Sequence, residues 1–146
     1  MIPLADFQFQ DHKGRLYSQD HFKGKVLLMD FWNTWCGACY QKFPELNQIH
    51  QNFALDSTVC ILAVNTAQYD SLAYIKKFTQ KYSYEFMTVL DVESRLSKLL
   101  GVEVVPMTFL VDKKGYVRLI HFGYGGKDEQ YAKNFINEIN KLLTEQ

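Results

Sequence analysis

The sequence predicts an α/β protein with a central mixed β-sheet that is flanked by helices. Short apolar or alternating segments, typical of strands, are separated by segments whose apolar residues recur every three or four positions, as in amphipathic helices. The chain has 146 residues, of which 47% are apolar and 15% aromatic. That length and composition favour one well-buried domain over residues 1–146.

The first elements are an N-terminal hairpin and a buried strand. Residues 7–10 alternate apolar and polar, the turn-like residues 11–14 follow, and residues 15–17 return as a short partner strand. The apolar run 26–32 predicts the central strand. A helix is expected after Cys36, with an inward stripe formed by Phe43, Leu46, His50 and Phe53.

The rest of the chain alternates strand and helix before a hairpin and a last helix. Gly101 ends one of these helices, and the turn 112–115 joins the two strands of the hairpin. In chain order we expect a strand near 58–64, a helix near 71–82, a strand at 85–90, a helix at 94–100, strands at 107–111 and 116–122, and a helix at about 128–143.

The segment Trp35-Cys36-Gly37-Ala38-Cys39 indicates redox chemistry. It follows the buried strand and opens a helix, so Cys36 lies where backbone N–H groups have no intrahelical partner and the helix dipole is positive. Both effects favour the thiolate, which is the form that attacks disulfides. We therefore expect Cys36 to be the nucleophile and Cys39, one helical turn deeper, to be the resolving thiol.

A zinc site is the alternative interpretation of a Cys-x-x-Cys pair. Structural zinc usually takes four ligands, and neither Cys60 nor the four histidines show ligand spacing. We therefore expect no metal and no organic cofactor. Cys60 lies in an apolar strand-like run and is interpreted as a buried core thiol.

The charge balance and the N-terminus restrict partners and location. The formal net charge is zero, with 16 basic and 16 acidic side chains, so nothing favours nucleic acid or an anionic membrane surface as a partner. No apolar run approaches the roughly 18 residues of a membrane helix. Residues 1–4 lack the features of a secretory signal, so either the protein is cytoplasmic or the chain begins after a removed signal or anchor.

Two segments carry a family resemblance. The block from Lys25 to Cys39 resembles the active-site segment of the thioredoxin superfamily, and residues 105–112 resemble its loop with a cis-proline, here Pro106, facing the two cysteines. The continuation Phe43-Pro44-Glu45-Leu46, the N-terminal hairpin and a central insertion at about 68–94 resemble the TlpA-like thiol–disulfide oxidoreductases. The resemblance implies a thioredoxin-like fold.

The same resemblance implies a function and a site. The expected activity is disulfide exchange with disulfide-bearing proteins, as a reductant supplied by an upstream electron donor. Pro106 is expected to restrict the loop opposite Cys36, leaving the backbone of Val105 to pair with an extended peptide. Trp35, Gly37 and Ala38 are expected to contact the substrate, with Trp35 covering the cysteines. Relatives are usually exported and often membrane-tethered, so we expect a monomer in the periplasm or another extracytoplasmic compartment.

Asp30 is the single charge in the run 26–32, on one strand face with Leu28 and Trp32. A carboxyl group buried there has a raised pKa and can take the proton from Cys39, whereas an aspartate at a solvated sheet edge would be inert. Asp30 also matches the buried aspartate of thioredoxin itself.

Three positions depart from the relatives. Ala38 stands where many have proline, and Lys42 stands where the cytochrome-maturation members typically have glutamate. The lysine that accompanies the buried aspartate in thioredoxins is replaced by Ala63. The departure at Lys42 argues against transferring the specific function of the cytochrome-maturation members.

Two other functions remain open. Thiol peroxidases share this fold and hairpin, but they need a single peroxidatic cysteine in a pocket lined by threonine and proline, and the paired cysteines argue against this. A copper-handling module is the non-enzyme alternative, because soft thiolates bind cuprous ions. No histidine stands at a convincing third-ligand position.

Overall fold

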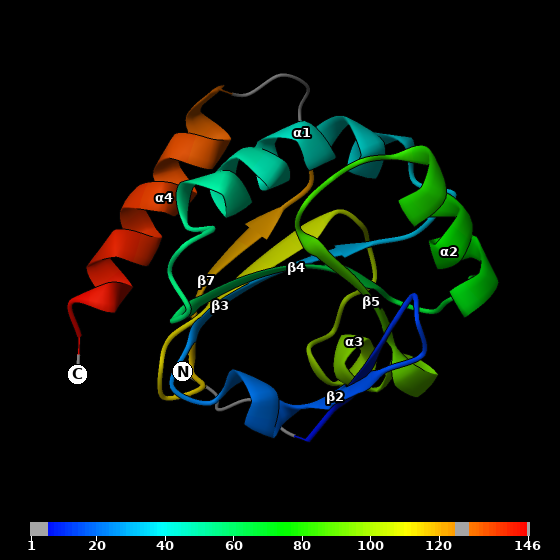
Figure 1. Cartoon of the computed structure of the whole chain (residues 1–146), viewed down its shortest axis with the longest axis horizontal. Helices are drawn as coiled ribbons and strands as arrows, with labels where there is room; N and C mark the ends of the chain where they lie inside the picture. Colours follow the sequence, from blue (N-terminus) through cyan, green and yellow to red (C-terminus); the bar gives the residue numbers. More distant parts are fainter. Residues whose placement is uncertain (1–5, 125–128, 146) are drawn as a thin grey trace.

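The computed structural model describes residues 6–124 and 129–145. Within these residues, seven strands form one mixed sheet in the order β2-β1-β5-β4-β3-β6-β7 (Figure 1). The strands are β1 Gln8–Asp11, β2 Leu16–Ser18, β3 Val26–Trp32, β4 Val59–Asn65, β5 Met87–Asp91, β6 Met107–Val111 and β7 Val117–Phe122. The α-helices are α1 Gly37–Asn52, α2 Leu72–Lys81, α3 Arg95–Leu99 and α4 Glu129–Leu143.

The sheet topology confirms the predicted α/β class. The central strand β3 pairs in parallel with β4 and antiparallel with β6, and β4 pairs in parallel with β5. The N-terminal hairpin joins the sheet through β1, which is antiparallel to β5. The segment predicted as an insertion therefore supplies α2 and also β5, the strand that connects the hairpin to the rest of the sheet. The last predicted helix begins at Glu129, and Asp128 lies outside the described residues.

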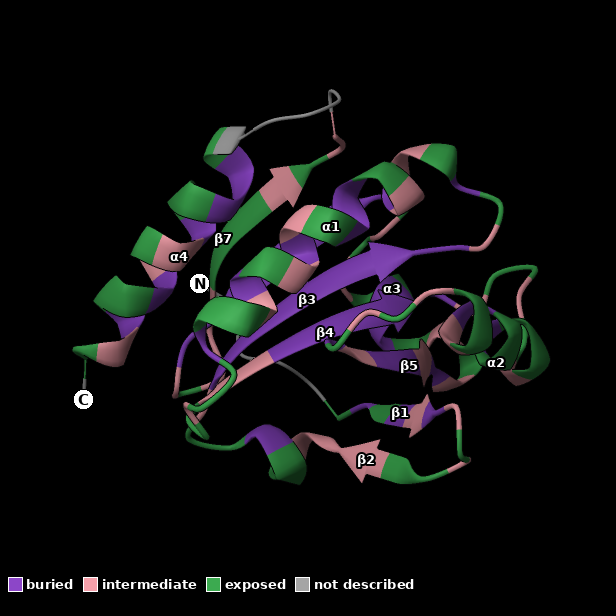
Figure 2. Ribbon diagram, turned by 45° about the horizontal axis from the view of Figure 1, so that its top comes forward, coloured by how far each residue is buried: buried purple, intermediate pink, exposed green. Residues whose placement is uncertain are grey.

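The sheet separates two apolar layers. Helices α1, α2 and α4 cover one face, where the side chains of Phe43, Ile75 and Phe135 are buried. Helix α3 and the residues around Phe9 and Phe22 cover the other face. Figure 2 shows the result: β3 and most of β4 are buried, whereas the exposed residues lie on the outer sides of the helices and along the outer strands.

Strand β3 is buried along its whole length. A strand that is covered on both faces reads as a continuous apolar run, which explains the composition of residues 26–32. The exception is Asp30, whose side chain is fully buried with the rest of the strand. A charged group in such a position requires a partner from a neighbouring element.

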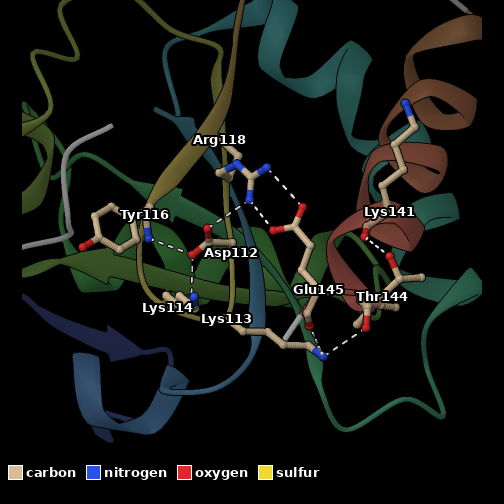
Figure 3. A network of polar contacts seen from close by, with 9 residues as sticks. Asp112, Lys113, Lys114, Tyr116, Arg118, Lys141, Thr144 and Glu145 are labelled. Carbon is tan, nitrogen blue, oxygen red and sulfur yellow. Dashed lines mark hydrogen bonds and ion pairs between the residues drawn. The ribbon is translucent and has the colours of Figure 1, made fainter.

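The C-terminal end of the chain is fastened to the turn between β6 and β7 (Figure 3). Arg118 donates to Asp112 at 3.2 Å and forms a double contact with Glu145, at 2.5 and 3.1 Å. Lys113 donates to the carbonyl of Leu143 at 3.1 Å. These contacts hold the end of α4 against the sheet, and α4 itself supplies a residue to the candidate site. No helix in the described ranges has the length and apolarity needed to cross a membrane.

Candidate active site

Cys36 and Cys39 form a disulfide at the start of α1. Cys36 is the N-cap residue of the helix, with extended backbone angles, and its sulfur accepts a hydrogen bond from the backbone N–H of Cys39 at 3.2 Å. A helix leaves its first N–H groups without intrahelical partners, and here a sulfur takes the place of the usual side-chain oxygen. The predicted location of Cys36 is confirmed.

The two cysteines differ in their exposure to solvent. Cys36 is 7% exposed and Cys39 is fully buried. Gly37 is exposed, Ala38 is half-buried, and both lie on the rim of the pair. A Cβ atom at Gly37 would meet nothing within 4 Å, so packing does not require glycine there. Cys36 is therefore the less buried of the two cysteines, and Gly37 beside it is exposed at the surface.

The loop before β6 lies next to Cys36. The Val105–Pro106 peptide is cis, as the resemblance implies. The carbonyl oxygen of Val105 lies 3.7 Å from the sulfur of Cys36. The sulfur of a disulfide carries no proton, so this is a contact rather than a hydrogen bond in the oxidised form, whereas a reduced Cys36 thiol can donate to the same oxygen.

Asp30 lies in a buried polar cluster that includes Lys42, which is three residues past Cys39 on α1. One carboxylate oxygen, Oδ1, is 3.0 Å from the ammonium of Lys42 and accepts a hydrogen bond from the hydroxyl of Thr108 at 3.3 Å. The other oxygen, Oδ2, is buried and has no hydrogen-bond partner among the described residues. The alternative interpretation of Asp30, as an aspartate at a solvated sheet edge, is therefore wrong.

Lys42 is fully buried and completes this cluster. Its ammonium also donates to the Thr108 hydroxyl and lies 4.6 Å from the centre of the Tyr131 ring. The hydroxyl of Tyr131 is 2.9 Å from that of Thr108. Because a hydroxyl can accept two hydrogen bonds and donate one, Thr108 accepts from Lys42 and Tyr131 and donates to Asp30. The cluster thus joins α1, β3, β6 and α4.

The burial of this cluster changes the pKa of Asp30 and of Tyr131. Burial raises the pKa of Asp30 above its ordinary value, and the charge and hydrogen bond of Lys42, together with the hydrogen bond from Thr108, oppose that rise. Burial and the nearby Asp30 carboxylate raise the pKa of Tyr131 well above its ordinary value, so its hydroxyl remains protonated.

Sequence reasoning missed the partner of Asp30. Ala63 does lie beside Asp30 in the parallel register of β3 and β4, but a lysine reaches the carboxylate from α1 instead. The available signal was the spacing: Lys42 is three residues past Cys39 and precedes Phe43, and Cys39, Phe43 and Leu46 all point inward. A lysine on the inward stripe of a helix indicates a buried acidic partner.

The two tryptophans occupy different environments. Trp32 is fully buried among aromatic residues of α1 and α2. Trp35 is 57% exposed, and its indole N–H donates to the carbonyl of Gln68 at 3.2 Å. The side chain of Trp35 is therefore tied to the loop between β4 and α2.

Cys60 lies away from the redox pair. It pairs in register with Leu27 near the beginning of β4, whereas Cys36 follows the other end of β3. Its side chain is half-buried, less than expected, and burial raises its pKa to about 11, so it is a neutral thiol at physiological pH. A cavity of about 830 Å³ is lined by Cys60 and its neighbours in this part of the sheet, and neither Cys36 nor Cys39 lines it. In residues 6–124 and 129–145, no group of three His, Cys, Asp or Glu side chains could hold a metal ion.

Comparisons with known proteins agree with this geometry. Residues 2–120 match the AhpC/TSA family. Thiol-disulfide oxidoreductase ResA of Geobacillus thermodenitrificans is 32% identical over 124 residues, which cover 85% of this chain and 70% of that protein. The thioredoxin-like protein YneN of Bacillus subtilis is 30% identical over 129 residues, which cover 88% and 74%. A crystal structure described as a thiol:disulfide interchange protein DsbE from Chlorobium tepidum has a TM-score of 0.80 at 27% identity, over 97% of this chain and 95% of that one.

We predict that Asp30→Asn destabilises the fold, because the amide leaves the ammonium of Lys42 buried without a counter-charge. Breaking a buried ion pair from one side lowers the free energy of unfolding by about 3–5 kcal/mol. The double variant Asp30→Asn/Lys42→Met removes both charges and should recover most of that loss. Urea unfolding of the three proteins measures the difference, and an Asp30→Asn variant as stable as the wild type would contradict the prediction.

Proposed function

The chain belongs to the AhpC/TSA family and is a thioredoxin-like thiol–disulfide oxidoreductase, and on this premise we propose that it reduces disulfides in partner proteins. The observation that carries the proposal is the asymmetric Cys36–Cys39 pair at the start of α1, next to the cis-proline loop. In the reduced protein, the sulfur at the helix start is the accessible one and the helix terminus favours its thiolate.

The proposed reaction has two steps. The Cys36 thiolate attacks a substrate disulfide, forms a mixed disulfide and releases one substrate thiolate. Cys39 then loses its proton and attacks the sulfur of Cys36, which re-forms the Cys36–Cys39 disulfide and releases the second substrate thiolate. Two electrons pass to the substrate in each cycle, and an upstream dithiol donor restores the reduced pair.

Asp30 is the proposed proton acceptor for Cys39. Only the carboxylate form can accept a proton, and burial raises the pKa of Asp30, which favours the protonated form. Lys42 opposes that effect through its charge and its hydrogen bond, so it maintains the form of Asp30 that acts as a base. We therefore propose Lys42 as a positioning residue that acts through Asp30.

Other titratable groups face the cluster. His121 on β7 lowers the pKa of Asp30, and Tyr131 on α4 faces the Lys42 ammonium. Glu45 on α1 and Tyr124 contribute to the raised pKa of Tyr131. Lys42 forms an ion pair with Asp30 at 3.0 Å and lowers the pKa of Asp30 more than any other neighbouring group, so its removal should change that pKa most.

Substrate contacts and location are part of the proposal. Trp35, Gly37 and Ala38 form one side of the contact surface, and the backbone of Val105 forms the other and pairs with an extended peptide. The resemblance to ResA and DsbE proteins supports an extracytoplasmic location for the protein, acting as a monomer on disulfide-bearing proteins.

The reducing direction is tested by the reduction potential of the Cys36/Cys39 pair. We expect a value close to that of thioredoxin, about −270 mV, and a value near −120 mV would mark an oxidant instead. Insulin reduction measures the proposed activity itself. Peroxide consumption by the reduced protein, or stoichiometric cuprous ion binding without insulin reduction, would favour the peroxidase or copper alternative.

Substitution of each cysteine should give different products. Cys36→Ser is expected to abolish disulfide reduction because the accessible nucleophile is lost, whereas Cys39→Ser should accumulate a mixed disulfide through Cys36. Mass spectrometry of each variant after incubation with insulin detects the adduct. Equal trapping by both variants would reverse the assignment of nucleophile and resolving thiol.

Lys42→Met should move the pH dependence of the resolution step to higher pH. Loss of the ammonium raises the pKa of Asp30 further. At a fixed pH below the new pKa, each further unit of pKa lowers the fraction of Asp30 in the carboxylate form about tenfold. Acid quenching and mass spectrometry in single turnovers measure how fast the mixed disulfide disappears between pH 5 and 9.

Two variants control this experiment. Lys42→Arg keeps the charge and should retain a midpoint close to that of the wild type, and Lys133→Met removes an exposed lysine of α4 and should have no effect. In an Asp30→Asn background, Lys42→Met should produce no further kinetic change. An equal effect in both backgrounds would show that Lys42 does not act through Asp30.

A further inference from the structure

The carboxylate of Asp70 receives four hydrogen bonds from the edge of the active site. Its oxygen Oδ2 accepts from the backbone N–H of Thr34 at 2.8 Å and from the side-chain amides of Asn33 and Asn65, each at 3.0 Å. Its oxygen Oδ1 accepts from the Thr34 hydroxyl. No role in the exchange reaction has been assigned to this group so far.

These contacts join two loops at one end of the sheet. Asn33 and Thr34 connect the end of β3 to Cys36, and Asn65 to Asp70 connect the end of β4 to α2. Because β3 and β4 are parallel, the two loops leave the same edge of the sheet. Asn33 and Asn65 are buried, so loss of the carboxylate would leave their amide groups with fewer partners in a dry environment.

The second loop is conformationally strained. Ala67 and Tyr69 have φ values of 71° and 56°, in the left-handed region that side chains other than glycine rarely adopt. The backbone N–H of Ala67 donates to Asn65 at 2.9 Å and that of Gln68 donates to Thr66 at 3.2 Å, which holds the strained shape. Strain of this kind, when the surroundings maintain it, points to a functional constraint.

The strained loop holds one exposed aromatic ring, that of Trp35, and carries another, that of Tyr69. The carbonyl of Gln68 accepts from the indole N–H of Trp35 and from the side chain of Asn33, each at 3.2 Å. Tyr69, the next residue, is 84% exposed, and Trp35 is 57% exposed and directly precedes Cys36. We call Trp35 and Tyr69 the aromatic wall.

We infer that Asp70 is a positioning residue that holds the aromatic wall beside Cys36, and that the wall makes the enzyme favour protein disulfides over small disulfides. The inference rests on the proposed function and deepens it. Aromatic rings fixed in place offer a large apolar contact area with little entropy to lose on binding. Residues that flank a protein disulfide can use this area, whereas a small disulfide has no flanking residues to place on it.

The test compares two substrates in single turnovers of the pre-reduced protein. Asp70→Ala should lower the second-order rate constant for insulin about tenfold, equivalent to about 1.4 kcal/mol. The rate constant for 5,5′-dithiobis(2-nitrobenzoate), a small aromatic disulfide, should change less than about twofold, because Cys36 keeps its place at the helix start. Asp70→Asn retains the shape and one acceptor oxygen, so its effect on insulin should be intermediate.

A matched control removes a similar aspartate elsewhere. Asp56 accepts hydrogen bonds from the backbone N–H and the hydroxyl of Thr58, but it precedes β4 at the other end of the sheet. Asp56→Ala should therefore leave both rate constants unchanged, even if it lowers stability.

Variants of the aromatic wall itself test whether Asp70 affects insulin reduction through Trp35 and Tyr69. Tyr69→Asn removes the ring while tolerating the left-handed backbone, and Trp35→Ser removes the other ring. The double variant should lose insulin activity to the same extent as Asp70→Ala, and adding Asp70→Ala to it should cause no further loss. Acrylamide quenching of the wild-type fluorescence reports chiefly Trp35, since Trp32 is fully buried, and Asp70→Ala should increase this quenching.

The outcomes separate this inference from the proposed function. An equal fall for both substrates in Asp70→Ala would show that Asp70 holds the nucleophile and not the wall, which overturns the inference. Unchanged insulin reduction or unchanged quenching in that variant would also overturn it. A wild-type protein that reduces the small disulfide but not insulin would overturn the proposed function itself.

Discussion

The hydrogen bond between the backbone N–H of Cys39 and the sulfur of Cys36 is the interaction on which the site depends. A helix must satisfy the N–H groups of its first turn, and in this chain a sulfur atom does so. The sulfur that caps the helix is thereby fixed at the helix start, in the less buried of the two cysteines, while Cys39 lies one turn deeper. Strand β3, which leads into the helix, and the cis-proline loop beside it then have to meet at the sulfur of Cys36, where the Val105 carbonyl lies 3.7 Å away.

Much of the fold could be predicted from the sequence because its signals are local. The apolar run 26–32, the inward stripe of α1 and the turn at 112–115 each report the periodicity or turn chemistry of their own segment. The position of the redox pair could be predicted for the same reason, since a helix start depends on the residues immediately around it.

The two acidic side chains at the site show where local signals end. Asp30 could be predicted as buried, because its strand is apolar. Its partner Lys42 comes from another element, α1, and the sequence marks Lys42 only as a difference from relatives. Asp70 gave no signal at all: it is 36 residues from Thr34 in the sequence, and its role depends on how two parallel strands bring their following loops together. Polar networks formed between elements are specified by tertiary structure, which periodicity does not report.

The buried position of Lys42 also determines the net charge of the protein interior during disulfide exchange. A neutral Cys39 thiol, a carboxylate and an ammonium sum to zero charge, and a thiolate, a carboxyl group and an ammonium sum to zero as well. Proton transfer from Cys39 to Asp30 would therefore redistribute charge inside the protein without creating any net charge in a medium that solvates ions poorly. With an apolar residue in place of Lys42, the same interior would carry one uncompensated negative charge both before and after the transfer.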